Sequence, residues 1–222
     1  MEKSNTITKK IIPILRKQTK QFEPTLIETI ISEYGKNPFL ILIGCLLSLR
    51  SRDVVTVHVC RNLFKRGQAP QEILAIPKSQ LEKIIFKTGC YRKKAKVLHE
   101  VSRVIIEEYR GKVPRSKDKL SKIKGLGPKT VNLVLGLAFD TPAICIDTHV
   151  HRISNLLGLI KTKTPTQTEH ELEKIVKREN WIEWNNLLVI WGQNICTPGA
   201  PKCAECALKN ICKFQKHVKL RH

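Results

Sequence analysis

Apolar residues recur every three or four positions along most of the chain, as they do on one face of a helix. Asn37-Pro38 has the form of a helix cap followed by a first-turn proline, and it predicts a very apolar helix to Leu49. A second helix is predicted from Val54 to Phe64. A third helix is predicted because apolar residues recur at helical spacing at Val97, Val101, Val104 and Ile105, and Gly111 ends it. No alternating segment of useful length predicts a strand, so the pattern indicates an all-α protein.

Local signals mark the ends of two further helices. Pro24 fits the first turn of a helix that runs toward Tyr34, where Gly35 stops it. Thr164-Pro165-Thr166-Gln167 has the form of a capping box, and it predicts a helix to about Lys177. These signals indicate short loops between helices.

Charge narrows the class of partner. The chain has 222 residues, enough for one large or two small domains, with 40 Lys and Arg against 19 Asp and Glu and a net charge of +21. Such an excess favours polyanionic partners, chiefly nucleic acid or an anionic membrane surface, over the alternative of a merely solubilising surface. No apolar run reaches the roughly eighteen residues that a membrane span needs. The basic residues are spread along the chain, which predicts a charged face on a folded body.

The eight cysteines fall into two groups. Four are scattered among apolar neighbours: Cys45, Cys60, Cys90 and Cys145. The other four follow the pattern C-x6-C-x2-C-x5-C: Cys196, Cys203, Cys206 and Cys212. No secretory signal is evident, which favours a reducing compartment and a metal site over disulfides. The spacing alone leaves zinc and a [4Fe–4S] cluster open. A closed cluster would also present Lys202 on a fixed loop suited to a DNA backbone.

Residues 120–131 predict a helical hairpin. A short helix ends at Gly125-Leu126-Gly127, and a second begins at Pro128, where the ring costs no hydrogen bond. Gly125 and Gly127 permit positive φ and close approach of another backbone. The N–H groups of the new helix start form a phosphate site. A glycine turn alone fits a simple helix corner, but Lys129 in the first turn of a basic chain favours a hairpin that grips DNA.

Lys129 and Asp147 are the candidate catalytic side chains. A neutral amine is a nucleophile, and lysines form Schiff bases with sugar carbonyl carbons, although a lysine here is more often a phosphate contact. Asp147 precedes an apolar-periodic helix that ends at Gly158, so helix capping is its ordinary role. The two roles are compatible, because a capping carboxylate is held rigid and can still face a cleft.

The hairpin lysine, the aspartate and the cysteine spacing, in this order, resemble the endonuclease III family of helix-hairpin-helix DNA glycosylases from about Ile27 to Cys212. The resemblance implies two α-helical domains with DNA in the cleft between them. One is a six-helix barrel with the hairpin, at 31–141. The other, at 1–30 and 142–222, is an iron–sulfur domain built from both termini. One [4Fe–4S] cluster on the four clustered cysteines, rather than zinc, is then implied.

The resemblance also implies base excision repair of double-stranded DNA that carries a damaged base or an abasic site. An oxidised pyrimidine is flipped out, Lys129 attacks C1′ of the sugar, and Asp147 assists proton transfer and stabilises positive charge on the sugar. The Schiff base then permits β-elimination, which cuts the strand 3′ to the abasic site. We expect a monomer that uses no membrane, in the cytoplasm at the nucleoid.

Three alternatives stay open at this point. A monofunctional adenine or thymine mismatch glycosylase of the same superfamily is disfavoured by Lys129, because such relatives carry Ser, Tyr or another residue there. A non-catalytic DNA-binding protein leaves the pairing of Lys129 with Asp147 unexplained. A ferredoxin-like electron carrier does not fit so large and basic a chain.

Several positions bear on DNA contact. Arg50 stands where the family often has glutamine, and its side chain is expected to fill the gap left by the flipped base. Cys90 stands where a larger apolar wedge is common; it is either a weak wedge or a small buried residue. Lys124 replaces a frequent proline and adds a phosphate contact. The hairpin's Thr130 and the histidine His149 complete the expected DNA-contact residues, with Gly125, Gly127 and Lys202.

Overall fold

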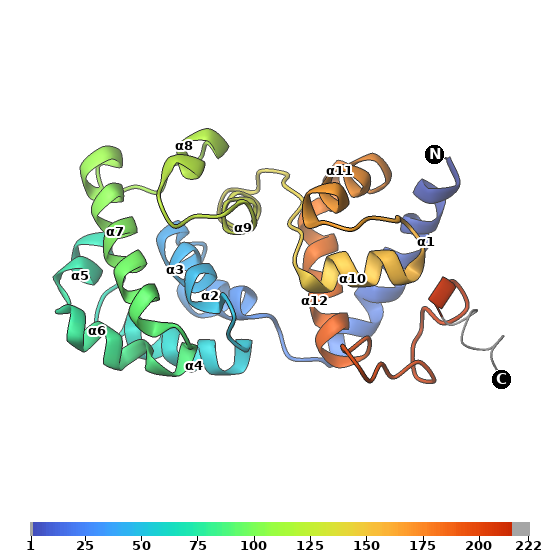
Figure 1. Ribbon diagram of the computed structural model, residues 1–222, viewed down its shortest axis with the longest axis horizontal. Helices are drawn as coiled ribbons and strands as arrows, with labels where there is room; N and C mark the ends of the chain where they lie inside the picture. Colours follow the sequence, from blue (N-terminus) through green and yellow to red (C-terminus); the bar gives the residue numbers. More distant parts are fainter. Residues whose placement is uncertain (1, 215–222) are drawn as a thin grey trace. The chain divides into compact units, whose positions relative to one another are not determined.

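The computed structural model describes residues 2–214, and these contain helices and no strand (Figure 1). The all-α prediction is therefore confirmed. The chain divides into two compact units. One runs from Thr25 to Thr141, and we name it the hairpin unit; the other, the terminal unit, joins the segment up to Pro24 with the segment that starts at Pro142. No helix among the described residues is long and apolar enough to cross a membrane.

The hairpin unit is built around one buried helix, α3 (Pro38–Ser48). Every residue from Phe39 to Leu47 in this helix is buried, and it packs against α2, α4, α7 and α9 (Figure 1). The other helices of the unit are α2 (Leu26–Tyr34), α4 (Asp53–Phe64), α5 (Pro70–Ala75), α6 (Lys78–Ile85), η2 (Phe86–Thr88), α7 (Tyr91–Tyr109), α8 (Lys117–Lys122) and α9 (Pro128–Phe139).

The start of α3 follows its sequence signal. The Asn37 side-chain oxygen accepts hydrogen bonds from the backbone N–H groups of Phe39 at 3.0 Å and Leu40 at 3.3 Å, and Pro38 occupies the first turn. One side chain thus satisfies two N–H groups that lack a partner within the helix. The predicted helix and its cap are confirmed.

Helix α2 packs tightly on α3 through a glycine. A Cβ at Gly44 would overlap the Ile30 side chain and lie 3.2 Å from Ile27 Cδ1, so the close approach requires glycine. Residues 25–30 therefore pack with the hairpin unit. The expected domains, 31–141 against 1–30 and 142–222, place these six residues with the termini. The assignment of functional domains stays a prediction.

The terminal unit joins both ends of the described chain. Its helices are α1 (Glu2–Gln18), η1 (Thr19–Gln21), α10 (Thr148–Leu157), α11 (Pro165–Ile175), η3 (Arg178–Asn180) and α12 (Trp181–Asn194). Ile11 and Leu15 of α1 are fully buried in one core with Trp184 and Trp191 of α12. The Thr8 hydroxyl donates to the Ile175 carbonyl at 3.0 Å. These long-range contacts, rather than local signals, hold α1 against the C-terminal helices.

Helix ends elsewhere match local signals to within a few residues. The capping box of α11 is present: Thr164 Oγ1 accepts from the Gln167 N–H at 3.2 Å, and Gln167 Oε1 accepts from the Thr164 N–H at 3.3 Å. Helix α2 begins after Pro24 rather than at it, because Thr25 forms a capping box with Glu28.

Candidate active site and metal centre

The predicted hairpin is formed by α8, a turn and α9. Leu120, Ile123 and Leu126 are buried beneath it. Gly125 has φ 98°, and a Cβ there would lie 2.8 Å from Val97 Cγ1, so the turn packs closely on α7. The predicted need for glycine is therefore confirmed at Gly125.

Gly127 behaves differently from the prediction. Its φ is −83° and ψ 167°, an extended conformation that any residue adopts, because it serves as the N-cap of α9. The expected positive φ at this position is wrong. Among the described atoms outside its immediate chain neighbours, none lies within 4 Å of the position of a Cβ there. The N-cap of α9 is thus exposed and has no side chain, so the positive end of this helix is open to an anion.

Lys129 is half-buried in the first turn of α9, directly behind this open cap. Its charge reaches the buried thiol of Cys45 on α3: burial raises the pKa of Cys45 to about 12, and Lys129 acts to lower it while Asp53 acts to raise it. Lys129 is therefore close to the α3 core on one side. Thr130, in contrast, is only 2% exposed, so its side chain faces the core, and its expected DNA contact does not fit the hydroxyl.

Two exposed loop tips lie in the same unit. Arg50, after α3, has φ 55°, and Cys90, after η2, has φ 46°. A left-handed conformation costs a non-glycine residue roughly 1–2 kcal/mol, so packing around both tips must hold them. A Cβ at Gly89 would lie 3.8 Å from the Arg50 carbonyl oxygen, which places the tips side by side. The alternative that Cys90 is a small buried residue is wrong, because Cys90 is exposed.

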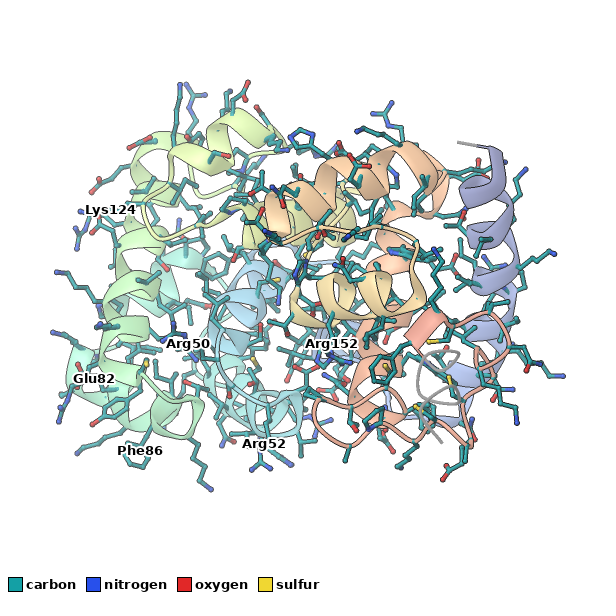
Figure 2. The ribbon with its side chains drawn as sticks, turned by 45° about the vertical axis from the view of Figure 1, so that its right-hand side comes forward. Arg50, Arg52, Glu82, Phe86, Lys124 and Arg152 are labelled. Carbon is teal, nitrogen blue, oxygen red and sulfur yellow. The ribbon has the colours of Figure 1, made fainter. Side chains whose placement is uncertain are left out.

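An aromatic surface adjoins the Cys90 tip. Phe86 is 60% exposed and its ring lies 4.9 Å from that of Tyr91, with the Arg92 guanidinium 5.3 Å from the Tyr91 ring centroid. Figure 2 labels Phe86 and Arg50 on this unit. The sequence does not single out Phe86, because in the run Ile84-Ile85-Phe86 it is typical of a core residue.

Asp147 is the N-cap of α10, in the terminal unit. Its Oδ1 accepts a hydrogen bond from the Val150 N–H at 2.8 Å, so the capping role is confirmed. His149, in the first turn, is half-buried with its ring against α12, where a Cβ at Gly192 would overlap it. A hydrogen bond therefore holds the carboxylate, and packing against α12 holds the imidazole.

The four clustered cysteines follow α12. All four are half-buried, and Cys196, Cys206 and Cys212 pack against the core of the terminal unit. Burial raises the pKa of Cys203 and of Cys206, and negative charge at Cys196 and Cys212 raises both further. The four sulfur atoms therefore interact across a shared region.

Arg152 connects α10 to this cysteine segment (Figure 2). Its guanidinium donates to the Cys196 carbonyl at 2.6 Å and to Cys196 Sγ at 3.4 Å. A cation beside a sulfur atom stabilises negative charge there, as metal–thiolate sites require. Sequence reasoning assigned Arg152 no role; its signal is its position three residues after His149, which places it on the same face of α10.

The donor set suits a thiolate-bound metal centre. Negative charge at Cys196 and Cys212 raises the pKa of Cys203 and of Cys206, and a cationic centre would offset this repulsion. Among residues 2–214, no three His, Cys, Asp or Glu side chains are close enough together to hold a metal ion.

Lys202, an expected DNA contact, lies in the loop between Cys196 and Cys203. Its backbone N–H donates to the Ile195 carbonyl at 2.9 Å, which fixes the backbone, and its side chain is exposed.

The candidate residues thus fall into two sets. The hairpin unit holds Lys129, the two hairpin glycines, Arg50 and Cys90, and the terminal unit holds Asp147, His149, Lys202 and the four cysteines. Both Lys129 and Arg50 lie next to α3. Lys129 is in the first turn of α9, which packs on α3, and Arg50 follows the C-terminal end of α3.

Comparisons with known proteins agree with these features. Residues 43–178 match the model of the HhH-GPD superfamily base excision DNA repair protein. Endonuclease III of Thermotoga maritima is 43% identical over 180 residues, 81% of this chain and 84% of that protein. Endonuclease III of Bacillus subtilis is 38% identical over 80% of this chain and 81% of that protein.

Solved structures share the fold. A non-covalent endonuclease III–DNA complex matches with a TM-score of 0.86 and 30% identity over 98% of this chain and 99% of that one. A thermostable thymine-DNA glycosylase matches with a TM-score of 0.81 at 24% identity, which shows the fold alone. The chain therefore belongs to the endonuclease III family of the helix-hairpin-helix superfamily, whose members are base excision DNA repair enzymes with glycosylase and abasic-site lyase activity.

Proposed function

We propose that this DNA glycosylase and lyase removes oxidised pyrimidines from double-stranded DNA and cuts the strand 3′ to the resulting abasic site. The observation that carries the proposal is the position of Lys129, half-buried in the first turn of α9 and directly behind the open cap at Gly127. A helix start that binds a backbone phosphate would bring the neighbouring amine to the sugar.

Lys129 supplies the nucleophile. Its neutral amine forms a bond to C1′ as the bond from C1′ to the damaged base breaks, and the base leaves with the electron pair and gains a proton. The amine loses its own proton and the sugar ring opens to a Schiff base. Loss of a proton from C2′ then expels the 3′ phosphate, which breaks the C3′–O bond. A serine or tyrosine cannot form this imine, so the mechanism separates the enzyme from a monofunctional mismatch glycosylase.

Asp147 supplies a fixed negative charge. Its Oδ1 is held by the Val150 N–H at 2.8 Å, so the carboxylate needs no reorganisation as the sugar becomes electron-poor. It assists proton transfer during imine formation. His149, held against Gly192, and Lys202, on its fixed loop, then contact the DNA backbone.

Cys196, Cys203, Cys206 and Cys212 hold one [4Fe–4S] cluster in this proposal. When bound, the cluster supplies a rigid centre that fixes the intervening loop. Arg152 supports the set through its bond to Cys196 Sγ. The purified protein should be yellow-brown with broad absorption near about 400 nm. Cys203→Ser should lower iron and sulfide content, and Cys90→Ser, an exposed cysteine elsewhere, should not. Stoichiometric zinc without sulfide in protein made under iron-replete anaerobic conditions would contradict the assignment.

Borohydride trapping tests the central step. Wild-type protein incubated with an oxidised-pyrimidine duplex and borohydride should give an adduct that survives denaturation, because reduction locks the imine. Lys129→Gln should give none at protein concentrations that saturate the DNA, while Lys65→Gln, which removes an exposed lysine of the same unit, should trap normally. Base release without trapping by the wild type would identify a monofunctional glycosylase. An undiminished adduct in Lys129→Gln would refute the assignment of Lys129.

The partner is expected to be duplex DNA with a damaged base or an abasic site, bound by a monomer at the nucleoid. Sedimentation with a duplex that carries a non-cleavable abasic analogue would measure the stoichiometry. Two protein copies per lesion would contradict the monomer.

A further inference from the structure

Lys94 is a buried lysine outside the sites described above. It lies in the first turn of α7, and only 8% of it is exposed. Its Nζ donates hydrogen bonds to the carbonyl of Leu47 at 2.8 Å and to the carbonyl of Thr88 at 2.7 Å. A buried ammonium is costly unless it is paired, so this geometry is built by the fold rather than incidental.

Both acceptors lie at helix ends. Leu47 is the second-to-last residue of α3, and Thr88 is the last residue of η2. The last carbonyls of a helix lack partners within it and carry the negative end of its dipole, which suits a cation. Burial lowers the pKa of Lys94, and the thiols of Cys60 and Cys90 act to raise it. One ammonium therefore ties the ends of two separate helices together.

Each of these helix ends leads into a strained tip. The chain runs three residues from Leu47 to Arg50 and two residues from Thr88 to Cys90. Both tips are left-handed, at φ 55° and 46°, and Gly89 brings the second tip beside the Arg50 carbonyl. Without Lys94 the two carbonyls lose their common partner, and the two tips can move independently.

We propose that Lys94 is a positioning residue that sets the relative placement of Arg50 and Cys90 for insertion into the gap left by a flipped nucleotide. The inference rests on the proposed function, because it assumes that both tips enter DNA. Its new element is that one side chain, that of Lys94, fixes the position of the two tips relative to each other. The sequence offers no sign of this, since Lys94 is one of several basic residues in the run Arg92-Lys93-Lys94-Ala95-Lys96.

A double-mutant cycle tests the inference, because a residue that acts through Arg50 must be energetically coupled to it. Arg50→Ala should slow single-turnover excision of an oxidised pyrimidine by about tenfold in a Lys94 background. In the Lys94→Met background, which keeps the aliphatic stem, Arg50→Ala should have an effect of less than about twofold. Lys94→Arg, which restores a cation, should recover part of the coupling. Lys96→Met, an exposed change on the same helix, should leave the full effect of Arg50→Ala.

A fluorescence signal separates positioning from general loss of structure. With 2-aminopurine opposite a non-cleavable abasic analogue, wild type should change the emission of the orphan base as Arg50 fills the gap. Lys94→Met should give the emission of Arg50→Ala, with the duplex still saturated. Additive effects of Lys94→Met and Arg50→Ala, or wild-type emission from Lys94→Met, would overturn the inference. If Lys94→Met does not fold, the same measurements on Lys94→Gln decide, because its shorter, neutral amide cannot replace the ammonium between the carbonyls of Leu47 and Thr88.

Trapping of an abasic duplex, run in parallel, distinguishes this failure from failure of the proposed function. Wild type that traps an abasic site but shows no coupling between Lys94 and Arg50 refutes the inference alone. Wild type that does not trap refutes the proposed function itself.

Discussion

The two helices that carry the proposed catalytic side chains, α9 and α10, begin with different caps. Helix α9 starts at Gly127, which has no side chain, and open space surrounds the position of its missing Cβ among the described atoms beyond its chain neighbours. Helix α10 starts at Asp147, whose carboxylate bonds the Val150 N–H. The positive end of α9 is therefore available to an external anion, whereas the Asp147 carboxylate already occupies the positive end of α10. One helix end is suited to hold DNA, and the other to hold a carboxylate still.

Removal of the charge at the start of α10 should have the largest effect. Asp147→Asn keeps a side-chain oxygen for the Val150 N–H, so the cap and the fold should persist, while the charge that stabilises the electron-poor sugar is lost. We expect excision to fall by about 10²–10⁴-fold, with damaged-DNA affinity largely retained. Single-turnover kinetics and binding to an uncleavable substrate measure the two quantities.

Asp147→Ala sharpens this result. It removes both charge and cap, so it should also lower the free energy of unfolding by about 1 kcal/mol. Equal stability of the Asn and Ala variants would mean that the hydrogen bond to Val150 contributes nothing, and near-normal excision by Asp147→Asn would remove Asp147 from the mechanism.

A carboxylate placed at the start of α9 should have the next largest effect. Gly127→Asp fits the extended backbone and the open space, and it gives α9 the same kind of cap that α10 has. The negative charge occupies the proposed phosphate position, so affinity for undamaged duplex should fall by about tenfold, and the slope of log K against log salt should become shallower by about one. The unsubstituted protein, with about five phosphates neutralised, should show a slope of −4 to −5.

Gly127→Asn is the matched control. It provides a neutral cap of the same shape and should weaken binding much less than Gly127→Asp. If both variants bind like wild type, the start of α9 does not contact phosphate. A flat salt response of the unsubstituted protein would mean that the net charge of +21 serves solubility alone.

The features that sequence predicted correctly are those with local causes. Asn37-Pro38 and Thr164 each place a capping oxygen a few residues from the N–H groups it accepts, and both caps are present. Pro128 begins α9 because its missing N–H has no intrahelical role there. Asp147 caps α10 for the same local reason. The hairpin and the position of Lys129 followed from these signals.

Features with distant causes left no local signal in the sequence, and only the family resemblance led us to expect that the two termini join in one unit. Helix α1 is held by Thr8 and Arg16 contacts to residues more than 160 positions away. The Lys94 ammonium donates to two carbonyls at the ends of separate helices, and no sequence pattern around Lys94 predicts these partners. Phe86 follows a helical apolar run yet projects outward, because the chain turns into η2 at that residue. Hydrophobic periodicity predicts which face of a helix is apolar, but it does not predict which side chains become exposed where the helix ends in a turn.

The two hairpin glycines provide the smallest and most local test of the difference between packed and open backbone. Gly125→Ala should lower the free energy of unfolding by more than about 1 kcal/mol, because φ is 98° and the new Cβ would lie 2.8 Å from Val97 Cγ1. Gly127→Ala should change it by less than about 1 kcal/mol, since the loss of a favourable cap residue is offset by the reduced freedom of the unfolded chain. In a chain of this length about 2–4 °C in Tm corresponds to each kcal/mol, so thermal unfolding resolves the pair. If Gly127→Ala destabilised as much as Gly125→Ala, the extended conformation and open surroundings of Gly127 would be wrong, and with them the phosphate position at the start of α9.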